Sequence, residues 1–410
     1  ECEKSKDSVI PEDKVGQLQK VILPDELEKE ENKGGTLFLN TAPFYGQISM
    51  TTFITNKALR DYPQKVKDNV FYVPDYLTIG NARAVFGATG VSQTIWQADI
   101  DKTANQDNRW KDVPVLVYAN CPNITNTIDV MPDGDYVETI GKAAFCNAIR
   151  LQTADLSKYT KLSNIGSGSL SYSESHYKGV FSECFALKEV ILPESTAEEF
   201  VLGEETFYKE INDDITAATC SEPKRQDALL KVNMGNITEM GEKAFAGCIV
   251  LKDIRCSLRL KEIPKNAFKN CISLQNVDFG QVEYIDEKAF YNCKAIELRE
   301  QVEGLEEWNC QLPDCLNEIG KNAFEIADFV REDDMGTAVF GPNLVTIGSC
   351  AFKSNGISKV DFKKAQNLET IGDTAFYNCW LENFELSGTK VSVLETSLLA
   401  GCLKLQSVSL

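Results

Sequence analysis

The chain has 410 residues, of which 61 are acidic and 42 basic, so its formal net charge at pH 7 is −19. Such an acidic balance argues against nucleic acid and anionic membranes as partners and favours solubility. The sequence contains no run of eighteen apolar residues, so we expect no transmembrane helix.

The N-terminal segment ECEKSKDS is charged and has no apolar signal core. We therefore expect that any secretion signal has been removed or was never present. Cys2 is a candidate lipid-attachment residue. We favour the alternative of an ordinary Cys in a frayed end, because acylation would place the Cys first in the chain.

Residues 1 to 135 contain fragments of a pattern that becomes regular only downstream. Leu18, Val21 and Leu23 match a later strand motif, and Ile54, Ala58 and Leu59 match a helical motif. The segment 118–130 repeats a later frame with one extra residue. We interpret residues 1–135 as degenerate repeats with long inserts. The alternative is a separate small β-rich region at 36–75, where the sequence alternates but shows no repeat.

Residues 136 to 410 carry a repeat, Ile-Gly-x-x-Ala-Phe-x-x-Cys-x-x-Leu, at intervals of about two dozen residues. Its clearest copies pair Phe245 with Cys248, Phe268 with Cys271, Phe290 with Cys293 and Phe376 with Cys379. The tail Leu-x-x-Val-x-Leu alternates and predicts a strand, and the preceding apolar spacing predicts a short helical turn. Single units of this size must stack to close a core, so the sequence predicts an α/β solenoid.

The positions of the cysteines in the repeat indicate that they pack in the core. Seven of the 14 cysteines occupy one slot of the repeat and predict a buried column: Cys121, Cys184, Cys248, Cys271, Cys293, Cys379 and Cys402. Cys310 with Cys315, or Cys220 with Cys256, remain possible disulfide pairs, because sequence alone gives no connectivity. No Cys or His quartet has the spacing of a zinc site.

Groups for catalysis are scarce. His176 is the only histidine and lies in a Ser-rich insert, LSYSESHYKG, without a nucleophile motif. Gly166 and Gly168 lack the Lys-Ser/Thr of a phosphate loop. Asp129, Asp133 and Gly134 begin like a calcium loop, but Ile140 stands where its bidentate Glu belongs. We therefore predict no catalytic residue, cofactor or metal ligand.

The residue between Val and Leu of each strand motif should project away from the core and stack into a stripe. The stripe reads Ile22, Asp129, Ile191, Arg255, Asp278, Asp361, Glu385 and Ser409. Asp361 and Glu385 come from consecutive units, where parallel stacking would bring like charges together. We predict a partner-binding stripe of Asp129, Arg255, Asp278, Asp361 and Glu385. The alternative is a solvated sheet surface without a partner.

Over residues 137–410 the frame Leu-x-x-Ile-Gly-x-x-Ala-Phe-x-x-Cys-x-x-Leu-x-x-Val-x-Leu resembles the BspA-like leucine-rich repeat family. The resemblance implies a right-handed solenoid with a parallel sheet on one face and short helical turns on the other. It also implies export by bacteria of the Bacteroides type, display at the cell surface, often as a lipoprotein, and adhesin-like binding of host matrix proteins or cells. Inserts at 150–180, 208–236 and 299–315 depart from the frame.

The leading hypothesis is a non-enzymatic protein, extracellular or at the outer cell surface, that binds a protein partner through its sheet face and inserts. A carbohydrate-binding accessory protein is the first alternative, with Trp96, Trp110, Trp308 and Trp380 as stacking platforms. A structural spacer is the second. The sequence does not fix the oligomeric state.

Overall fold

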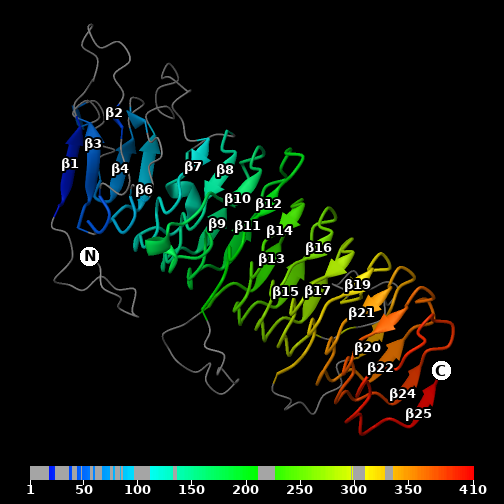
Figure 1. Cartoon of the computed structure of the whole chain (residues 1–410). Coiled ribbons are helices and arrows are strands. Elements are labelled where there is room, and N and C mark those ends of the chain that lie inside the picture. The colour runs from blue at the N-terminus through cyan, green and yellow to red at the C-terminus, as the bar shows by residue number, and fades with distance from the viewer. Residues whose placement is uncertain are drawn as a thin grey trace.

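A computed structural model describes residues 18–23, 37–38, 44–47, 49–55, 59–60, 67–73, 77–78, 84, 86–96, 111–132, 136–210, 227–296, 298, 310–327 and 336–410. These segments form an elongated stack of short parallel strands that runs from the N-terminal to the C-terminal end of the chain (Figure 1). No helix in this part of the chain is long and apolar enough to cross a membrane. The predicted α/β leucine-rich repeat solenoid is confirmed, with parallel sheets and few helices.

The sheet predicted from the Leu-x-x-Val-x-Leu segments is present. Its five-stranded part contains β9 (Thr153–Asp155), β11 (Glu189–Ile191), β13 (Lys231–Asn233), β15 (Asp253–Arg255) and β17 (Asn276–Asp278). Two further pairs follow: β20 (Thr337–Val339) with β22 (Lys359–Asp361), and β24 (Asn383–Glu385) with β25 (Ser407–Ser409). In β9 to β17 the middle residue of each strand is buried and its two neighbours face outward.

A second parallel sheet, which the sequence analysis did not predict, uses the residues just before the Ala-Phe turns. Its first part contains β7 (Asp112–Val113), β8 (Thr139–Gly141), β10 (Asn164–Ser167), β12 (Val201–Leu202) and β14 (Glu239–Met240). Its second part contains β16 (Glu262–Ile263), β18 (Tyr284–Ile285), β19 (Glu318–Ile319), β21 (Thr346–Ile347) and β23 (Thr370–Ile371). Most of these strands have only two residues, which is too short for alternation to show in the sequence.

The Ala-Phe segments, expected as short helical turns, are hydrogen-bonded turns and not α-helix. Asn266 and Asn270, on either side of Phe268, have φ angles of 57° and 64°, in the left-handed region. An α-helix has no place for such residues. The same turn explains why Asn or Gly precedes six of the seven column cysteines, because these residues adopt positive φ at least cost. Glu183, at a φ of 59°, precedes the seventh, Cys184. Two short 3-10 helices are described, η5 (Thr127–Asp129) and η6 (Tyr172–Glu174).

The N-terminal region adds a parallel four-stranded sheet of β1 (Lys20–Leu23), β3 (Thr52–Thr55), β4 (Val70–Val73) and β6 (Gln93–Trp96), and the pair β2 (Leu37–Phe38) with β5 (Leu77–Thr78). Ile54, expected in a helical motif, lies in β3. Phe53, Phe71 and Phe86 form edge-to-face pairs or tilted contacts and join the core through Tyr118. The division at residue 135 and a separate region at 36–75 stay predictions.

The core contains a column of stacked phenylalanine rings. From Phe145 to Phe376, successive centroids lie 4.9 to 5.5 Å apart with interplanar angles of at most 19°. This distance is slightly longer than the spacing of hydrogen-bonded parallel strands, so the repeat sets the ring stacking. The column is Phe145, Phe181, Phe207, Phe245, Phe268, Phe290, Phe324, Phe352 and Phe376.

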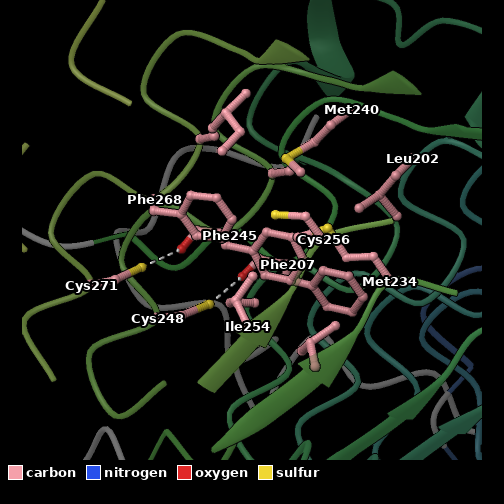
Figure 2. Close-up of a cluster of buried hydrophobic side chains, with 14 of the residues drawn as sticks. Leu202, Phe207, Met234, Met240, Phe245, Cys248, Ile254, Cys256, Phe268 and Cys271 are labelled. Atoms are coloured by element: carbon pink, nitrogen blue, oxygen red, sulfur yellow. Dashed lines mark hydrogen bonds between the residues drawn. The ribbon is translucent and has the colours of Figure 1, made fainter. Parts of the chain in front are cut away.

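The predicted cysteine column is also present, and each of its seven thiols donates to a phenylalanine carbonyl of the preceding unit. The Sγ···O distances are 3.0 to 3.3 Å. Figure 2 shows two of them, from Cys248 to Phe207 and from Cys271 to Phe245. Asn355 occupies the Cys slot of its unit, and its Nδ2 donates to the Phe324 carbonyl at 3.1 Å. The slot therefore combines packing with a donor that joins neighbouring units.

Candidate functional site

The outward face of sheet β9–β17 carries two of the five predicted stripe residues, Arg255 and Asp278. Its register aligns two outward rows across the five strands: Thr153, Glu189, Lys231, Asp253 and Asn276 in one, and Asp155, Ile191, Asn233, Arg255 and Asp278 in the other. Glu189, Ile191, Lys231, Asn233 and Arg255 are exposed. The face is therefore of mixed charge and less acidic than the predicted stripe.

Arg255 and Asp278 are brought together by the β15–β17 register. The Arg255 Nε lies 3.4 Å from the Asp278 Oδ2, and both side chains are about half exposed. The Asp278 Oδ1 also accepts from the Gly280 N–H at 3.1 Å. This ion pair holds the Arg255 and Asp278 side chains against each other on the outward face.

Asp361 and Glu385 lie on β22 and β24, two strands that belong to separate hydrogen-bonded pairs. Asp361 aligns with Val339, and Glu385 with Ser409. The Lys363 Nζ lies 3.8 Å from the Asp361 Oδ2, and the Lys363 N–H donates to the Asp361 Oδ1 at 2.8 Å. The Asp361 charge is thus partly balanced by its own loop.

Asp129 lies outside any strand, at the end of η5. Asn126 bridges to Thr153, so Asp129 falls one residue beyond the position that would align with Asp155. Burial raises the pKa of the Asp129 carboxyl. The extra residue noted in the sequence is the physical reason for this offset.

A second outward row, on the unpredicted sheet, contains an exposed tyrosine between acidic residues. Register aligns Glu262, Tyr284 and Glu318 across β16, β18 and β19. Tyr284 is 43% exposed. Burial, and to a smaller extent the Asp286 charge, raise the pKa of Glu262. A sequence search for Tyr or Glu directly before each buried Ile would have found this row, once that Ile was recognised as a strand residue.

The residues with catalytic potential are placed as follows. His176 is exposed and stacks on the Tyr177 ring at 4.1 Å. The Asn120 Nδ2 donates to the hydroxyls of Tyr45 and Tyr177, each at 2.9 Å, which ties the 150–180 insert to the N-terminal region. In the described segments, no group of three His, Cys, Asp or Glu side chains is arranged to hold a metal ion.

The thiols are poor nucleophiles. Burial raises the pKa of Cys121 and of Cys184 to about 12, so both are protonated at neutral pH. Cys256 and Cys315 are free thiols, and no disulfide joins Cys310 to Cys315. Cys2 and Cys220 lie outside the described residues, as do Trp110 and Trp308. Of the proposed stacking tryptophans, Trp380 has its ring under the Lys404 Nζ at 4.0 Å, and the Trp96 side chain is not described.

Parallel strands at a constant period, a column of stacked phenylalanines and a slot of buried cysteines define a leucine-rich repeat solenoid. The family model for BspA type leucine rich repeat regions matches residues 111–218, 226–329 and 328–410, with six copies. The chain belongs to the BspA type leucine-rich repeat family. The match begins upstream of residue 136, at a segment that we expected to be degenerate.

Solved structures with a similar fold come from several bacteria. A leucine-rich repeat protein from Bacteroides ovatus is 16% identical, with a TM-score of 0.40, and the match covers 73% of this chain and 78% of that one. A leucine rich cell surface protein from Faecalibacterium prausnitzii is 16% identical, with a TM-score of 0.34, over 92% and 91% of the two chains. The T. pallidum leucine-rich repeat protein is 18% identical, with a TM-score of 0.34, over 53% and 77%. A comparison with curated proteins gave no match.

Proposed function

We propose that this chain is a non-enzymatic binding protein, extracellular or at the outer cell surface, that recognises a protein partner through the outward face of sheet β9–β17 and the adjoining inserts. The observation that carries the proposal is the pair of aligned outward rows, which presents exposed side chains of both charges over five units. Extended rigid faces of this kind are the binding surfaces of solenoid proteins.

The stripe residues differ in what they would contribute. Arg255 is exposed and oriented by Asp278, so it is our candidate for the centre of the contact. Asp361 and Glu385 would add long-range attraction for a basic partner, and exposed charges of this type act mainly on the association rate. Asp129, offset from the row, would contribute at its edge.

The test is a pulldown of solubilised host matrix and cell-surface proteins at two salt concentrations. We compare the intact chain with Asp361→Lys plus Glu385→Lys and, separately, with Arg255→Glu. Asp373→Lys plus Glu395→Lys is the matched control, because it makes the same charge change in neighbouring units at exposed turn residues. We expect capture to be weakened by high salt and by both stripe variants, and to survive in the control.

Capture that is unchanged at high salt and in every variant would indicate that the partner binds the inserts and not the sheet face. Loss of capture in the control as well would assign the effect to net charge, and no capture at all would contradict the proposal. Surface location has its own test: protease treatment of intact source cells should remove the protein, whereas full protection would contradict it.

The tryptophans give weaker support to the alternative of a carbohydrate-binding protein. Trp380 already has a cation above its ring, at 4.0 Å, which occupies a face that a sugar would need. A glycan array without signal would remove this alternative.

A further inference from the structure

Two buried groups of opposite charge lie in the 208–236 insert. Lys209 is 3% exposed, and its Nζ atom is buried. Both carboxylate oxygens of Asp227 are buried as well. Within the described segments, none of these three atoms makes a hydrogen bond, and no ion pair joins the two residues. Folded proteins rarely leave buried charged atoms in this state, so the pair needs a physical explanation.

Lys209 and Asp227 lie against the same turn of the next unit. The Lys209 N–H donates to the Ala246 carbonyl at 2.9 Å, and the Val250 N–H lies near the Asp227 carboxyl without a hydrogen bond to it. Cys248 belongs to this turn and is labelled in Figure 2. Burial raises the pKa of the Cys248 thiol, the Asp227 charge adds to the rise, and the Lys209 charge opposes it. The two side chains therefore share one buried environment around Cys248.

This environment is unfavourable for two separate charges. A buried ion loses its hydration, and only a direct partner compensates for that loss. The pair Lys265–Glu287 shows the ordinary arrangement, with Nζ and Oε2 2.7 Å apart and the side chains 40% and 30% exposed. Lys209 instead has the centre of the Phe185 ring 5.2 Å from its Nζ. Burial raises the pKa of the Asp227 carboxyl, with Lys209 opposing it, so the uncharged acid is favoured more than at an exposed Asp.

Glu183 is held by the residues on both sides of Lys209 in the chain. Its N–H donates to the Tyr208 carbonyl at 3.0 Å, and its Oε1 accepts from the Glu210 N–H at 2.6 Å. The Glu183 charge also acts on Cys248, as the Lys209 charge does. A carboxylate in this position can take a proton from the Lys209 ammonium.

We propose that Lys209 and Asp227 condense into an intramolecular amide, a covalent crosslink that closes the insert. The Lys209 ammonium passes one proton through Glu183 to the Asp227 carboxylate and turns from the Phe185 ring to the resulting carboxylic acid. The amine nitrogen attacks Cγ of Asp227, the bond from Cγ to the hydroxyl oxygen breaks, and the hydroxyl leaves as water with a proton from the nitrogen. One ammonium and one carboxylate thus become one neutral amide and one water, a balance that needs no oxidant.

The test is the mass of the intact chain, measured by mass spectrometry on denatured protein. We expect this mass to be lower by one water than the mass calculated for the expressed sequence. Digestion should yield a branched peptide that joins the segments containing Lys209 and Asp227. Trypsin should not cut after Lys209, because its ammonium is gone. The parent chain alone therefore decides whether the crosslink exists.

Two variants remove the reacting groups one at a time. Lys209→Arg keeps the positive charge but cannot form this amide, and Asp227→Ala removes the carbon that is attacked. We expect both variants to have the full calculated mass. Lys265→Arg is the matched control, because Lys265 also lies beside a carboxylate but in an exposed pair, and this variant should lose one water as the parent does. Circular dichroism checks that each variant is folded.

Glu183→Gln tests the proton carrier separately. In freshly purified protein we expect a smaller fraction with the lost water than in the parent. On incubation this fraction should rise at a rate at least about tenfold slower, because a positioned acid–base group is missing. Equal rates in this variant and the parent would exclude the role of Glu183.

A parent chain with its full calculated mass would overturn the crosslink. A water loss that persists in Lys209→Arg or Asp227→Ala would overturn it as well, and so would a water loss mapped to any other peptide. None of these results depends on the pulldown that tests the sheet face, so the two proposals fail separately.

Discussion

The cysteine slot shows how one residue type serves both packing and hydrogen bonding. Each thiol is buried, and six of the seven donate to a carbonyl that already accepts from its own unit. The Phe245 oxygen, for example, accepts from the Cys248 N–H at 3.1 Å and from the Cys271 Sγ at 3.1 Å. The thiol therefore uses the second lone pair of that carbonyl. This bond joins two units, so the slot adds stability between units rather than within one.

We predict that Cys271→Ala lowers the free energy of unfolding by about 1–2 kcal/mol, from the lost packing volume and the lost donor. Cys256→Ala is the matched control, because Cys256 is buried but donates no described hydrogen bond. Urea denaturation followed by fluorescence measures both. Equal losses at the two positions would show that the thiol bond contributes nothing.

The sequence predicted the buried cysteine column because seven cysteines occupy the same position of the repeat. Residues at one repeat position share one environment in the folded chain. The sequence did not predict the hydrogen bond from each thiol to a phenylalanine carbonyl. A cysteine that donates and one that does not donate look the same in the repeat pattern. Asn355 was the available clue: a polar residue in a buried slot indicates that the slot offers an acceptor.

The turns carry the main constraint at the scale of the element, because six of the nine turns of the ring column place residues at positive φ on both sides of their phenylalanine, and the other three on one side. Asn270 has a φ of 64° and makes the amide contact with Asn292. A β-branched residue is a strong outlier in this region, whereas Asn reaches it easily. The repeat thus selects Asn and Gly for backbone reasons, and the amide hydrogen bond between Asn292 and Asn270 is a consequence.

We predict that Asn270→Val destabilises the chain by about 2 kcal/mol, from left-handed strain plus the lost amide bond. Asn276→Val, on the outward face of β17, is the control: it also loses an amide hydrogen bond, to the Asp253 Oδ1 at 2.7 Å, but adds no left-handed strain, so it should cost no more than about 1 kcal/mol. Thermal unfolding followed by circular dichroism measures both. A neutral Asn270→Val would contradict the role of the left-handed turn.

Glu262 gives a pH-dependent prediction for the second sheet. Its pKa is raised by burial and then by Asp286, so its ionised form is less favourable in the folded chain than in the unfolded one. Ionisation of Glu262 therefore costs stability above its folded pKa, and this cost is absent below the unfolded value of about 4.3.

We predict that Glu262→Gln stabilises the chain by up to about 0.5 kcal/mol at pH 7 and not at pH 3.5. Glu283→Gln should do the reverse at pH 7, because it breaks the 2.7 Å ion pair with Lys261. Denaturant titrations at the two pH values separate these effects. A stabilisation by Glu262→Gln that persists at pH 3.5 would exclude the charge explanation.

The sequence analysis did not predict the second sheet because its strands are too short to show a pattern. β16, β18 and β19 have two residues each, and only one residue of each pair is buried. Two residues show no period, and the downstream Ala and Phe made the segment resemble a helical turn. The position of this sheet depends on how units stack, which is a property of neighbours and not of the local sequence.

The whole molecule is held together by contacts between neighbouring units. The ring column, the thiols and the ion pairs Lys243–Glu205, Lys265–Glu287 and Lys353–Glu325 each join consecutive units. Exposed pairs of this kind contribute little individually. The ring column therefore carries most of the coupling. The repeat placed phenylalanine at one position of each unit, but the sequence analysis did not predict that the rings stack.

We predict that Phe268→Ala divides the solenoid into two units that unfold separately. The substitution removes a fully buried ring with partners at 5.2 and 5.1 Å, and we expect it to cost about 3–5 kcal/mol. In a linear array, stability is the sum of unit and neighbour terms, so a loss at one interface stays local. Hydrogen exchange measured by mass spectrometry should therefore accelerate in β15–β18 while β8 and β25 keep their rates, and denaturation should show two transitions. Phe376→Ala, near the C-terminal end, should instead loosen only that end. Uniform acceleration along the chain in the Phe268 variant would mean that the stack folds as one cooperative unit, with coupling that extends beyond nearest neighbours.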